Sequence, residues 1–451
     1  MKKLCVNLAL AILTIGIISS CQKEKMNMDV NAPAMAQADL KGMNDLTANA
    51  LQYKALVEKN QEKTEAELAI LNQKIEKLKA DQSQVDNQEV TIRSGNSPIR
   101  VPQDYPSLQE AVNHSQSGGK IFIQGTVAEP GDVLVNVSGL TIQGQGSSPT
   151  INGSTLVITA QDIKVQNLRV NMATVISGTS GTKLMNSTFS ATNNVGALAP
   201  LVLMNSSSNE IKNCTVDGAY AGGTYQVGLL VDNLSNHNEI ENCTAKNTNG
   251  SFGQSASAFV IDGAENSIKN CTALNFIRGF SSFSDDSKNN EFSNCVANNG
   301  NDAGFVFLVP NGNHFTLENC TANNNTAGGI FIIGGFGTIS KCTANSNSGH
   351  GVFLLFGDFQ IEKSTFKYNN STGIVIVDIN PQTGEFFNHT GTLEKNTTDS
   401  NVLVGIYLLG LNNSVIEKNK STGNPVCDFN QTLCSGNTVS GNNFGTSCTD
   451  L

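Results

Sequence analysis

Apolar and polar residues alternate in a short stretch that recurs along the chain. The clearest copy is Ile211–Val216, which reads Ile-Lys-Asn-Cys-Thr-Val. Other copies stand at residues 184–189, 240–245, 268–273, 292–297, 317–322, 339–344 and 361–366. From Cys214 to Cys342, the cysteines of successive copies are 29, 28, 24, 25 and 22 residues apart. A repeat of this length is one supersecondary unit that buries its apolar face only by stacking on its neighbours, so the pattern predicts a solenoid.

The period of two predicts that each copy is a strand rather than a helix. The alternation slips by one residue at the asparagine. If Asn213 forms a one-residue bend, Ile211, Cys214 and Val216 all point inward. Asparagine tolerates a positive φ better than most other non-glycine residues, so we predict a column of such bends, one in each coil.

A second strand in each coil begins with glycine. Its copies stand at residues 304–307, 329–332, 351–354, 373–376 and 405–408. Three short strands and their turns fill a coil of about 22 residues. The pattern resembles the parallel β-helix repeat proteins of the NosD-like and pectate-lyase-like superfamily, over about three quarters of the chain. The resemblance implies an all-β fold, a right-handed parallel β-helix solenoid, but no particular activity, because one fold hosts many functions.

The stretch Ile99–Val112 looks like the opening cap of pectate-lyase-like β-helices. Ser107 and Glu110 have the spacing of a capping box, and the apolar residues after Ser107 mark one side of a short helix. Such a helix would close the open end of the solenoid. We expect the β-helix at residues 97–425, followed by a C-terminal cap or tail at residues 426–451.

We expect a helix before this cap. Residues 46–82 are rich in Leu, Ala, Glu, Lys and Gln, which favour helices, and contain neither glycine nor proline. Two sets of apolar residues in it have coiled-coil spacing, namely Leu68, Leu71, Ile75 and Leu78, and upstream of them Leu46, Ala50, Tyr53 and Val57. We therefore expect a helical, coiled-coil-like stalk at residues 46–92. It is either a solvated spacer or an oligomerising stalk, and the seam favours the second, as a homotrimer.

The chain starts with a basic segment and an apolar run, Leu8–Ile18, that is too short to span a membrane. The next residues, Ile18–Cys21, resemble a bacterial lipobox. The resemblance implies a lipoprotein signal peptide at residues 1–20, lipidation of Cys21 and a tether at residues 21–45. The alternative is an ordinary cleaved signal followed by a chance cysteine.

The residue after Cys21 and the net charge indicate where the protein is located and which partners it is expected to have. Residue 22 is Gln rather than Asp, which by the rule known for enteric bacteria implies the outer membrane of a Gram-negative bacterium. The protein would then face either the periplasm or the outside. The net charge of −10 comes without a basic tract, which argues against nucleic acid as a partner.

The cysteines of the repeat predict a buried ladder of free thiols, at Cys214, Cys243, Cys271, Cys295, Cys320 and Cys342. Neighbouring coils lie within reach of a disulfide. However, Ser187 and Ser364 occupy the same position in other copies, so the position requires a small side chain rather than a bond. Near the C-terminus, Cys427 and Cys434 either close a small loop through a disulfide or remain free.

A polysaccharide cleft on the glycine-led strands would need outward-pointing carboxylates or cations. The outward residues are instead mostly apolar, including Val306, Phe331, Phe353, Val375 and Tyr407. A strip of this length exceeds what soluble monomers normally expose, so we expect the N-terminal helix or another protomer to cover it. Alternatively, Phe331, Phe353 and Tyr407 are platforms on which sugar rings stack.

In three earlier coils, charged residues stand at or near the ends of these strands, where the other coils have apolar residues. Asp232 and Asp262 end successive strands and are candidate catalytic residues together with Arg278, while Asp285 and Asp286 are candidate ligands of a calcium ion. The alternative is that these aspartates accept hydrogen bonds from the backbone of turns.

Other catalytic motifs of the superfamily are incomplete. Gly349-His350-Gly351 looks like the G-H-G of polygalacturonases, and Asp285-Asp286 like their paired aspartates, but the two motifs stand too far apart and their partner motifs are missing. We therefore interpret the chain as a lipid-anchored envelope or surface β-helix scaffold that binds glycans or proteins and is non-catalytic. The alternative function is a polysaccharide lyase or glycoside hydrolase of the pectate-lyase-like superfamily, and a NosD-like metal-handling role is disfavoured by the small number of His residues, 5 in all.

Overall fold

The computed structural model describes residues 62, 64–83, 97–190, 198–218, 227–248, 257–308, 314–379 and 385–449. The lipobox with Cys21 and the upstream seam from Leu46 to Val57 lie outside these residues. Contacts divide the chain into an N-terminal unit, residues 61–296, and a C-terminal unit, whose described part begins at Ala297.

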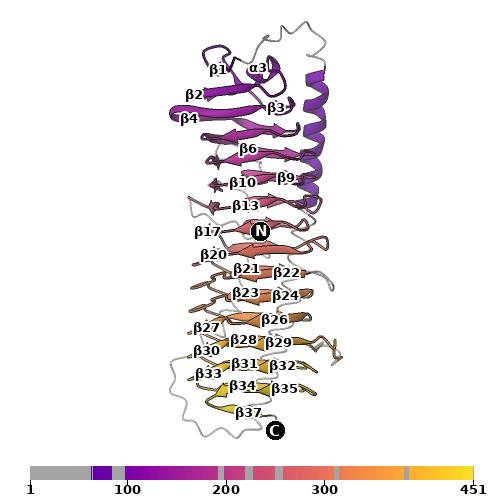
Figure 1. Cartoon of the computed structure of the whole chain (residues 1–451), viewed down its shortest axis with the longest axis vertical. Coiled ribbons are helices and arrows are strands. Elements are labelled where there is room, and N and C mark those ends of the chain that lie inside the picture. Colours follow the sequence, from indigo (N-terminus) through magenta and orange to yellow (C-terminus); the bar gives the residue numbers. More distant parts are fainter. Residues whose placement is uncertain are drawn as a thin grey trace, which may run out of the picture. The chain divides into compact units, whose positions relative to one another are not determined.

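The N-terminal unit is a parallel β-helix with three columns of strands (Figure 1). The first column contains β1 (Ile99–Val101), the first part of β2 (Lys120–Ala128) and of β4 (Thr141–Ile158), β5 (Lys164–Gln166), β7 (Lys183–Met185), β10 (Glu210–Lys212), β13 (Glu239–Glu241), β16 (Ser267–Lys269) and β19 (Asn290–Ser293). The second contains the last part of β2, the middle of β4, the first part of β6 (Arg169–Ser177), β8 (Thr188–Ser190), β11 (Thr215–Asp217), β14 (Thr244–Lys246) and β17 (Thr272–Leu274). The third contains β3 (Val133–Val135), the last parts of β4 and β6, β9 (Leu201–Met204), β12 (Val227–Val231), β15 (Ser257–Ile261) and β18 (Arg278–Ser282).

The C-terminal unit repeats the three columns, after β20 (Val296–Ala297) at the boundary. The first column contains β22 (His314–Glu318), β24 (Phe336–Ser340), β26 (Asp358–Glu362), β29 (Gly391–Glu394), β32 (Val415–Glu417) and β35 (Thr438–Ser440). The second contains β27 (Thr365–Lys367), β30 (Thr397–Asp399), β33 (Lys420–Thr422) and β36 (Asn443–Phe444). The third contains β21 (Ala303–Leu308), β23 (Gly328–Ile333), β25 (Val352–Leu355), β28 (Ile374–Val377), β31 (Val404–Leu409), β34 (Cys427–Thr432) and β37 (Ser447–Thr449).

The predicted bends are confirmed. Asn213, Asn242 and Asn270 have φ values of 55°, 54° and 53°. Lys341 and Lys363 take the same conformation in the coils that lack the asparagine, with φ values of 56° and 52°. Ile211, two residues before the bend, and Cys214, directly after it, are both buried, whereas Lys212, between Ile211 and the bend, is not. The alternation therefore slips by one residue, as the sequence predicted.

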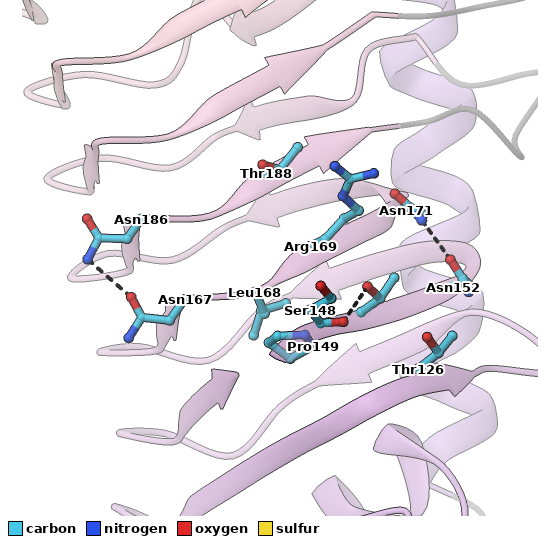
Figure 2. Close-up of a pocket in the computed structure, with 11 residues that line it drawn as sticks. Thr126, Ser148, Pro149, Asn152, Asn167, Leu168, Arg169, Asn171, Asn186 and Thr188 are labelled. Carbon is cyan, nitrogen blue, oxygen red and sulfur yellow. Dashed lines mark hydrogen bonds between the residues drawn. The ribbon is translucent and has the colours of Figure 1, made fainter. Parts of the chain in front are cut away.

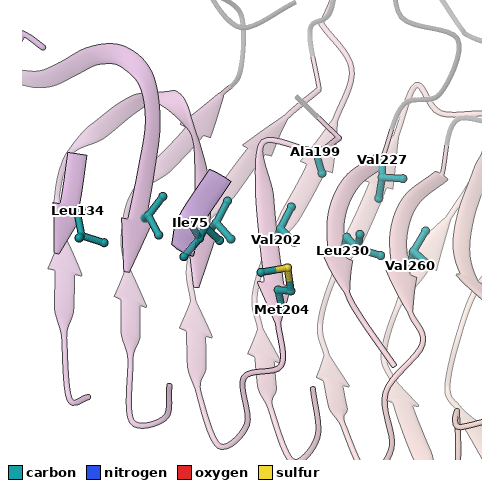
Figure 3. Packing of buried hydrophobic residues seen from close by; sticks show 10 residues of the cluster. Ile75, Leu134, Ala199, Val202, Met204, Val227, Leu230 and Val260 are labelled. Atoms are coloured by element: carbon teal, nitrogen blue, oxygen red, sulfur yellow. The ribbon is translucent and has the colours of Figure 1, made fainter. Parts of the chain in front are cut away.

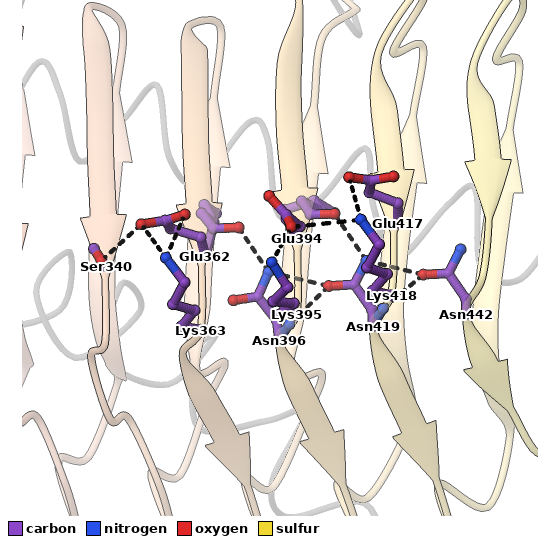
Figure 4. A network of polar contacts seen from close by, with 12 residues as sticks. Ser340, Glu362, Lys363, Glu394, Lys395, Asn396, Glu417, Lys418, Asn419 and Asn442 are labelled. Carbon is purple, nitrogen blue, oxygen red and sulfur yellow. Dashed lines mark hydrogen bonds and ion pairs between the residues drawn. The ribbon is translucent and has the colours of Figure 1, made fainter.

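Polar ladders run along the coils of the C-terminal unit (Figure 4). The buried Asn396 donates from its side-chain amide to Ile361 O at 2.7 Å and to Asn419 Oδ1 at 3.1 Å, and Asn419 repeats the pattern one coil later with Asn442. These amides satisfy backbone carbonyls that would otherwise be buried without a donor. Beside them, surface Glu–Lys pairs such as the half-buried Glu417 with the exposed Lys418 contribute little to stability because water screens them.

The opening cap is also confirmed. Helix α3 (Leu108–Asn113) starts after Ser107, whose hydroxyl accepts a hydrogen bond from the Glu110 backbone amide at 3.2 Å. The buried Glu129 accepts a second hydrogen bond at this end, from the Leu108 amide at 2.5 Å. A carboxylate at a helix N-terminus is stabilised by the unpaired amides there, and this one ties the cap to the first coil.

The helix at residues 64–83 is not a free stalk. Its seam packs on the outer face of the third column of its own unit, against a cluster that includes Leu134, Val202 and Leu230 (Figures 1 and 3). Ile75 in this seam is 0% exposed, and Lys74 bonds to Asp132 at 2.9 Å. The interpretation of this seam as an oligomerising surface was therefore wrong, whereas the expectation that the helix covers the apolar strip is confirmed for this unit. The homotrimer stays a prediction that this seam does not support.

The C-terminus differs from the prediction in two ways. The coils do not stop at residue 425, because β34 pairs with β31 and β37 pairs with β34. Cys427 is bonded to Cys448, with their Cα atoms 6.0 Å apart, whereas Cys434 is free. Of the two alternatives left open for Cys427 and Cys434, the small-loop bridge is therefore excluded, and Cys427 is instead bonded to a residue of the next coil.

The cysteine ladder is confirmed as six free, buried thiols, at Cys214, Cys243, Cys271, Cys295, Cys320 and Cys342. Within the residues that the structure describes, no helix is both long and apolar enough to cross a membrane.

Candidate functional site

The register of four successive coils aligns polar side chains on the outer face of the second column in the N-terminal unit (Figure 2). Thr126 pairs with Thr150, Thr150 with Arg169, and Arg169 with Thr188. The alternate residues of these strands, such as Val170, are buried. The strand period of two therefore directs the four polar residues outward in one line.

These side chains line a groove of about 690 Å³. Its other lining residues are Ser148, Pro149, Asn152, Asn167, Leu168, Asn171 and Asn186. Asn171 donates to Asn152 Oδ1 at 2.8 Å, and Asn186 donates to Asn167 Oδ1 at 3.2 Å. Hydrogen bonds between coils thus hold the amide groups of the groove in position.

Arg169 is the only charged residue among those described as lining this groove. It is exposed, and its guanidinium has no hydrogen-bond or ion-pair partner among the described residues. The other polar groups are neutral hydroxyls and amides, which match the hydroxyl groups of a sugar. Among the residues described in the lining there is no carboxylate.

A second polar cluster lies in the C-terminal unit, where one coil is longer than its neighbours. Ile339 pairs with Ile361, 22 residues on, but Ile361 pairs with Leu393, 32 residues on. The additional residues follow β28 and bring His389 back to Asp378. Asp378, which is 1% exposed, accepts hydrogen bonds from the His389 backbone amide at 2.8 Å and from its ring Nδ1 at 2.5 Å.

This pairing leaves His389 Nε2 without a partner among the residues described. The hydrogen bond to Asp378 raises the pKa of His389, burial lowers it, and the charges of Asp378 and Asp358 raise it further, so the net shift is upward. The ring of Phe387, which is 41% exposed, lies 6.0 Å from the imidazole. A carboxylate behind an imidazole with a free second nitrogen is an arrangement that general bases use.

Asp232 and Asp262 lie on adjacent coils, as the sequence predicted, and both are buried. Asp232 accepts hydrogen bonds from the Ser235 hydroxyl at 2.6 Å and the Asn205 amide at 3.1 Å. Asp262 accepts one from the Phe283 amide at 2.7 Å. These contacts favour their role as acceptors in turns, and their catalytic role stays a prediction. Arg278 begins β18 and is buried.

Of the two predicted calcium ligands, Asp286 accepts a hydrogen bond from the Asn233 side chain at 3.2 Å. The described part of the chain contains no group of three or more His, Cys, Asp and Glu residues that could hold a metal ion. Calcium binding at Asp285 and Asp286 thus stays a prediction from the sequence.

The predicted aromatic residues lie on the outer face of the third column, as expected. Phe331 and Phe353 stack with ring centroids 5.1 Å apart, but Phe353 is 3% exposed and Tyr407 is 5% exposed. A covered ring cannot receive a sugar, so Phe353 and Tyr407 favour the covered-strip interpretation, whereas Phe331 is half-buried. His350 accepts a hydrogen bond from the Thr372 amide at 3.4 Å, and burial lowers its pKa to about 4.

Sequence reasoning missed both polar clusters. Most of the groove lies before the copy of the motif at residues 184–189, of which only Asn186 and Thr188 contribute to the lining, and the strand register brings the other residues together. One feature of the sequence could have indicated the Asp378–His389 pair, namely the long interval between Ile361 and Leu393, which take the same position in successive coils.

Comparison with known proteins supports the fold. The family described as "Right handed beta helix region" matches residues 176–337, 257–390 and 329–448. No curated protein matches the chain. Among solved structures, the chain is similar to the catalytic unit of a thermostable GH87 α-1,3-glucanase from Streptomyces thermodiastaticus strain HF3-3, with 14% identity, 80% of this chain and 72% of that one covered, and a TM-score of 0.50.

Two other similar structures have lower scores. The alginate lyase AlyF-OU02 has 13% identity and a TM-score of 0.41, over 77% of this chain and 88% of that one. The A-module of the mannuronan C-5 epimerase AlgE4 from Azotobacter vinelandii has 14% identity and a TM-score of 0.41, over 74% of this chain and 91% of that one. At these identities the likeness extends to the fold alone. The family match, in contrast, spans more than half of the chain, and the protein belongs to the right-handed β-helix family.

Proposed function

We propose that this protein is a lipid-anchored envelope β-helix that binds a polysaccharide in the groove around Arg169. The observation that carries the proposal is the lining of the groove, which combines hydroxyl groups, amide groups held by hydrogen bonds between coils, and a guanidinium with no partner among the described residues. Sugars present hydroxyl groups to such a surface, and a uronate or other acidic sugar would place its carboxylate on Arg169. The fold likeness to an α-1,3-glucanase supports a polysaccharide rather than a protein as the ligand.

Affinity electrophoresis of the full chain in gels containing alginate, pectate, dextran or laminarin tests the proposal. We expect retardation by at least one acidic polysaccharide and at least a tenfold weaker binding by Arg169→Ala. Lys120→Ala is the matched control, because Lys120 is exposed on β2 and lies outside the groove lining. Equal retardation of both variants would refute the role of Arg169, and no retardation in any gel would refute the proposal.

Cleavage of a polysaccharide is the second candidate function, favoured by the free Nε2 of His389 and the exposed ring of Phe387 beside it. Sugar rings stack on such aromatic surfaces, and the imidazole could take a proton from the bound sugar. We would incubate the full chain with the same polysaccharides and measure reducing ends and unsaturated products. Cleavage that is lost in His389→Gln but kept in His237→Gln would support this site, and loss only in Asp262→Asn would place the chemistry at the aspartates of the N-terminal unit.

A further inference from the structure

The third column of the C-terminal unit carries an apolar strip on its outer face. Val306 pairs with Phe331, Phe331 with Phe353, Phe353 with Val375, and Val375 with Tyr407, so five coils contribute one residue each. We call these five residues the outer strip. Their inward neighbours on the same strands fill the core, so the strand period directs the outer strip away from it.

The outer strip is covered, although it points away from the core. Val306 and Val375 are 0% exposed, Phe353 and Tyr407 are buried, and Phe331 is half-buried. The residues described in this unit, from Ala297 onward, contain no helix that could cover a sheet face. In the N-terminal unit, the same face of the same column is covered by the helix at residues 64–83.

The sequence offers a matching second segment. Leu46, Ala50, Tyr53 and Val57 have the spacing of the seam that covers the N-terminal unit, and no glycine or proline interrupts the chain between them. As a helix, the stretch from Leu46 to Val57 would extend about 17 Å. Five stacked coils span about 19 Å from the first strand to the last, so one such helix matches the outer strip in length.

We propose that residues 46–57 of the same chain form a helix whose apolar side packs on the outer strip. Both parts of the N-terminal helical segment would then serve one purpose, which is to cover the apolar outer face of the third column. Burial of this face within one chain removes the need for a homotrimer. A chain held along the coils in this way would also fix where the tether at residues 21–45 leaves the solenoid.

Crosslinking within the full chain tests the proposal. Tyr53 is near the middle of the segment and Phe353 is in the middle of the outer strip, so a Tyr53→Cys and Phe353→Cys pair reports contact for either direction of the helix. All variants carry Cys434→Ser, which removes the partly exposed free thiol of the described residues. A short bismaleimide should join the two introduced cysteines, whereas Gln52→Cys with Phe353→Cys, one residue off the seam, should react at least fivefold less.

Mixing ¹⁵N-labelled and unlabelled chains before crosslinking separates this proposal from its rival. Crosslinked peptides of a single isotope composition support packing within one chain. Peptides that combine both isotopes would show that a second copy covers the outer strip, and equal reaction of the seam and control pairs would also overturn the proposal.

A second measurement avoids any change in the sheet. Tyr53→Asp with Val57→Asp should raise hydroxyl-radical oxidation of Tyr407 and Phe353 severalfold, because the charged residues would release the segment from the outer strip. Lys54→Asp is the control. Unchanged oxidation in the double variant would overturn the proposal.

Discussion

Asp262 accepts a hydrogen bond from the backbone amide of Phe283, at 2.7 Å from its Oδ1 atom. This contact joins the end of one strand to the turn of the next coil. Burial raises the pKa of Asp262 to about 7, and the neighbouring charge of Asp232 adds to the shift, whereas the hydrogen bond from Phe283 opposes it. The Asp262 side chain therefore stabilises the turn through its hydrogen bond, but burial makes its ionised form unfavourable.

The first prediction follows from this shift. Because the folded chain binds the proton of Asp262 more tightly than the unfolded chain, the free energy of unfolding should fall by roughly a few kcal/mol as the pH rises from about 4 to about 7. Asp262→Asn cannot ionise, so its urea midpoint relative to wild type should increase over this pH range. Asp285→Asn, which changes an exposed carboxylate in the next turn, is the control. A constant difference between Asp262→Asn and wild type would contradict the prediction.

The second prediction concerns the column of bends. Asn319 has a φ of 54°, a conformation that glycine adopts without strain and β-branched residues adopt with difficulty. We expect Asn319→Gly to change the free energy of unfolding by less than about 1 kcal/mol and Asn319→Val to lower it by about 1–2 kcal/mol. Urea unfolding of the two variants measures the difference. Equal stability of the glycine and valine variants would show that the bend does not depend on backbone preference.

The fold was predictable because its determinants are local. The period of two, the asparagine bend and the glycine-led strand each recur in successive coils. The repeat can therefore be recognised even where one copy departs from the pattern. The covering helix was predictable only as one of two alternatives, since a 3–4 apolar spacing suits a sheet face as well as a partner helix. The groove depends on which residue of β4 pairs with Arg169 in the next coil. The long strand β4 contains a register shift between Asn152 and Thr155, so this pairing could not be predicted from the sequence.

The third prediction concerns the cysteine ladder. Cys342 is buried, and Ser364 takes the same position one coil later, where its hydroxyl accepts a hydrogen bond from the Cys342 amide at 3.0 Å. Cys342→Ser should therefore cost less than about 1 kcal/mol, whereas Cys342→Leu should cost about 1–3 kcal/mol through overpacking. Thermal unfolding provides the comparison. In the folded wild type, the ladder thiols should not react with a thiol reagent until a denaturant is added, and rapid reaction without denaturant would contradict their burial.

The fourth prediction concerns the last coil. The disulfide between Cys427 and Cys448 spans 21 residues and holds β37 to the end of the solenoid. Cys448→Ser should lower the stability of this coil by about 2–4 kcal/mol, because the bond restricts the unfolded chain. Cys434→Ser, which removes a free thiol nearby, should have little effect. Limited proteolysis with mass spectrometry should locate new cleavage after β34 in the first variant alone, and the same cleavage in both variants would argue against a stabilising bond.

The last prediction separates a structural from a chemical role of His389. Its folded-state pKa is raised above the unfolded value, mainly by the hydrogen bond with Asp378, so the stability that the pair contributes is fully present below about pH 6.5 and is lost as the pH rises through the folded-state pKa. Asp378→Asn removes the charge that favours the imidazolium and should lower the pKa of His389, read from the NMR shift of the ring proton. If His389 also serves as a general base, the pH at which cleavage begins should fall with that pKa in the same variant. A shifted titration without any shift in the activity profile would limit the pair to holding the long turn after β28 in place.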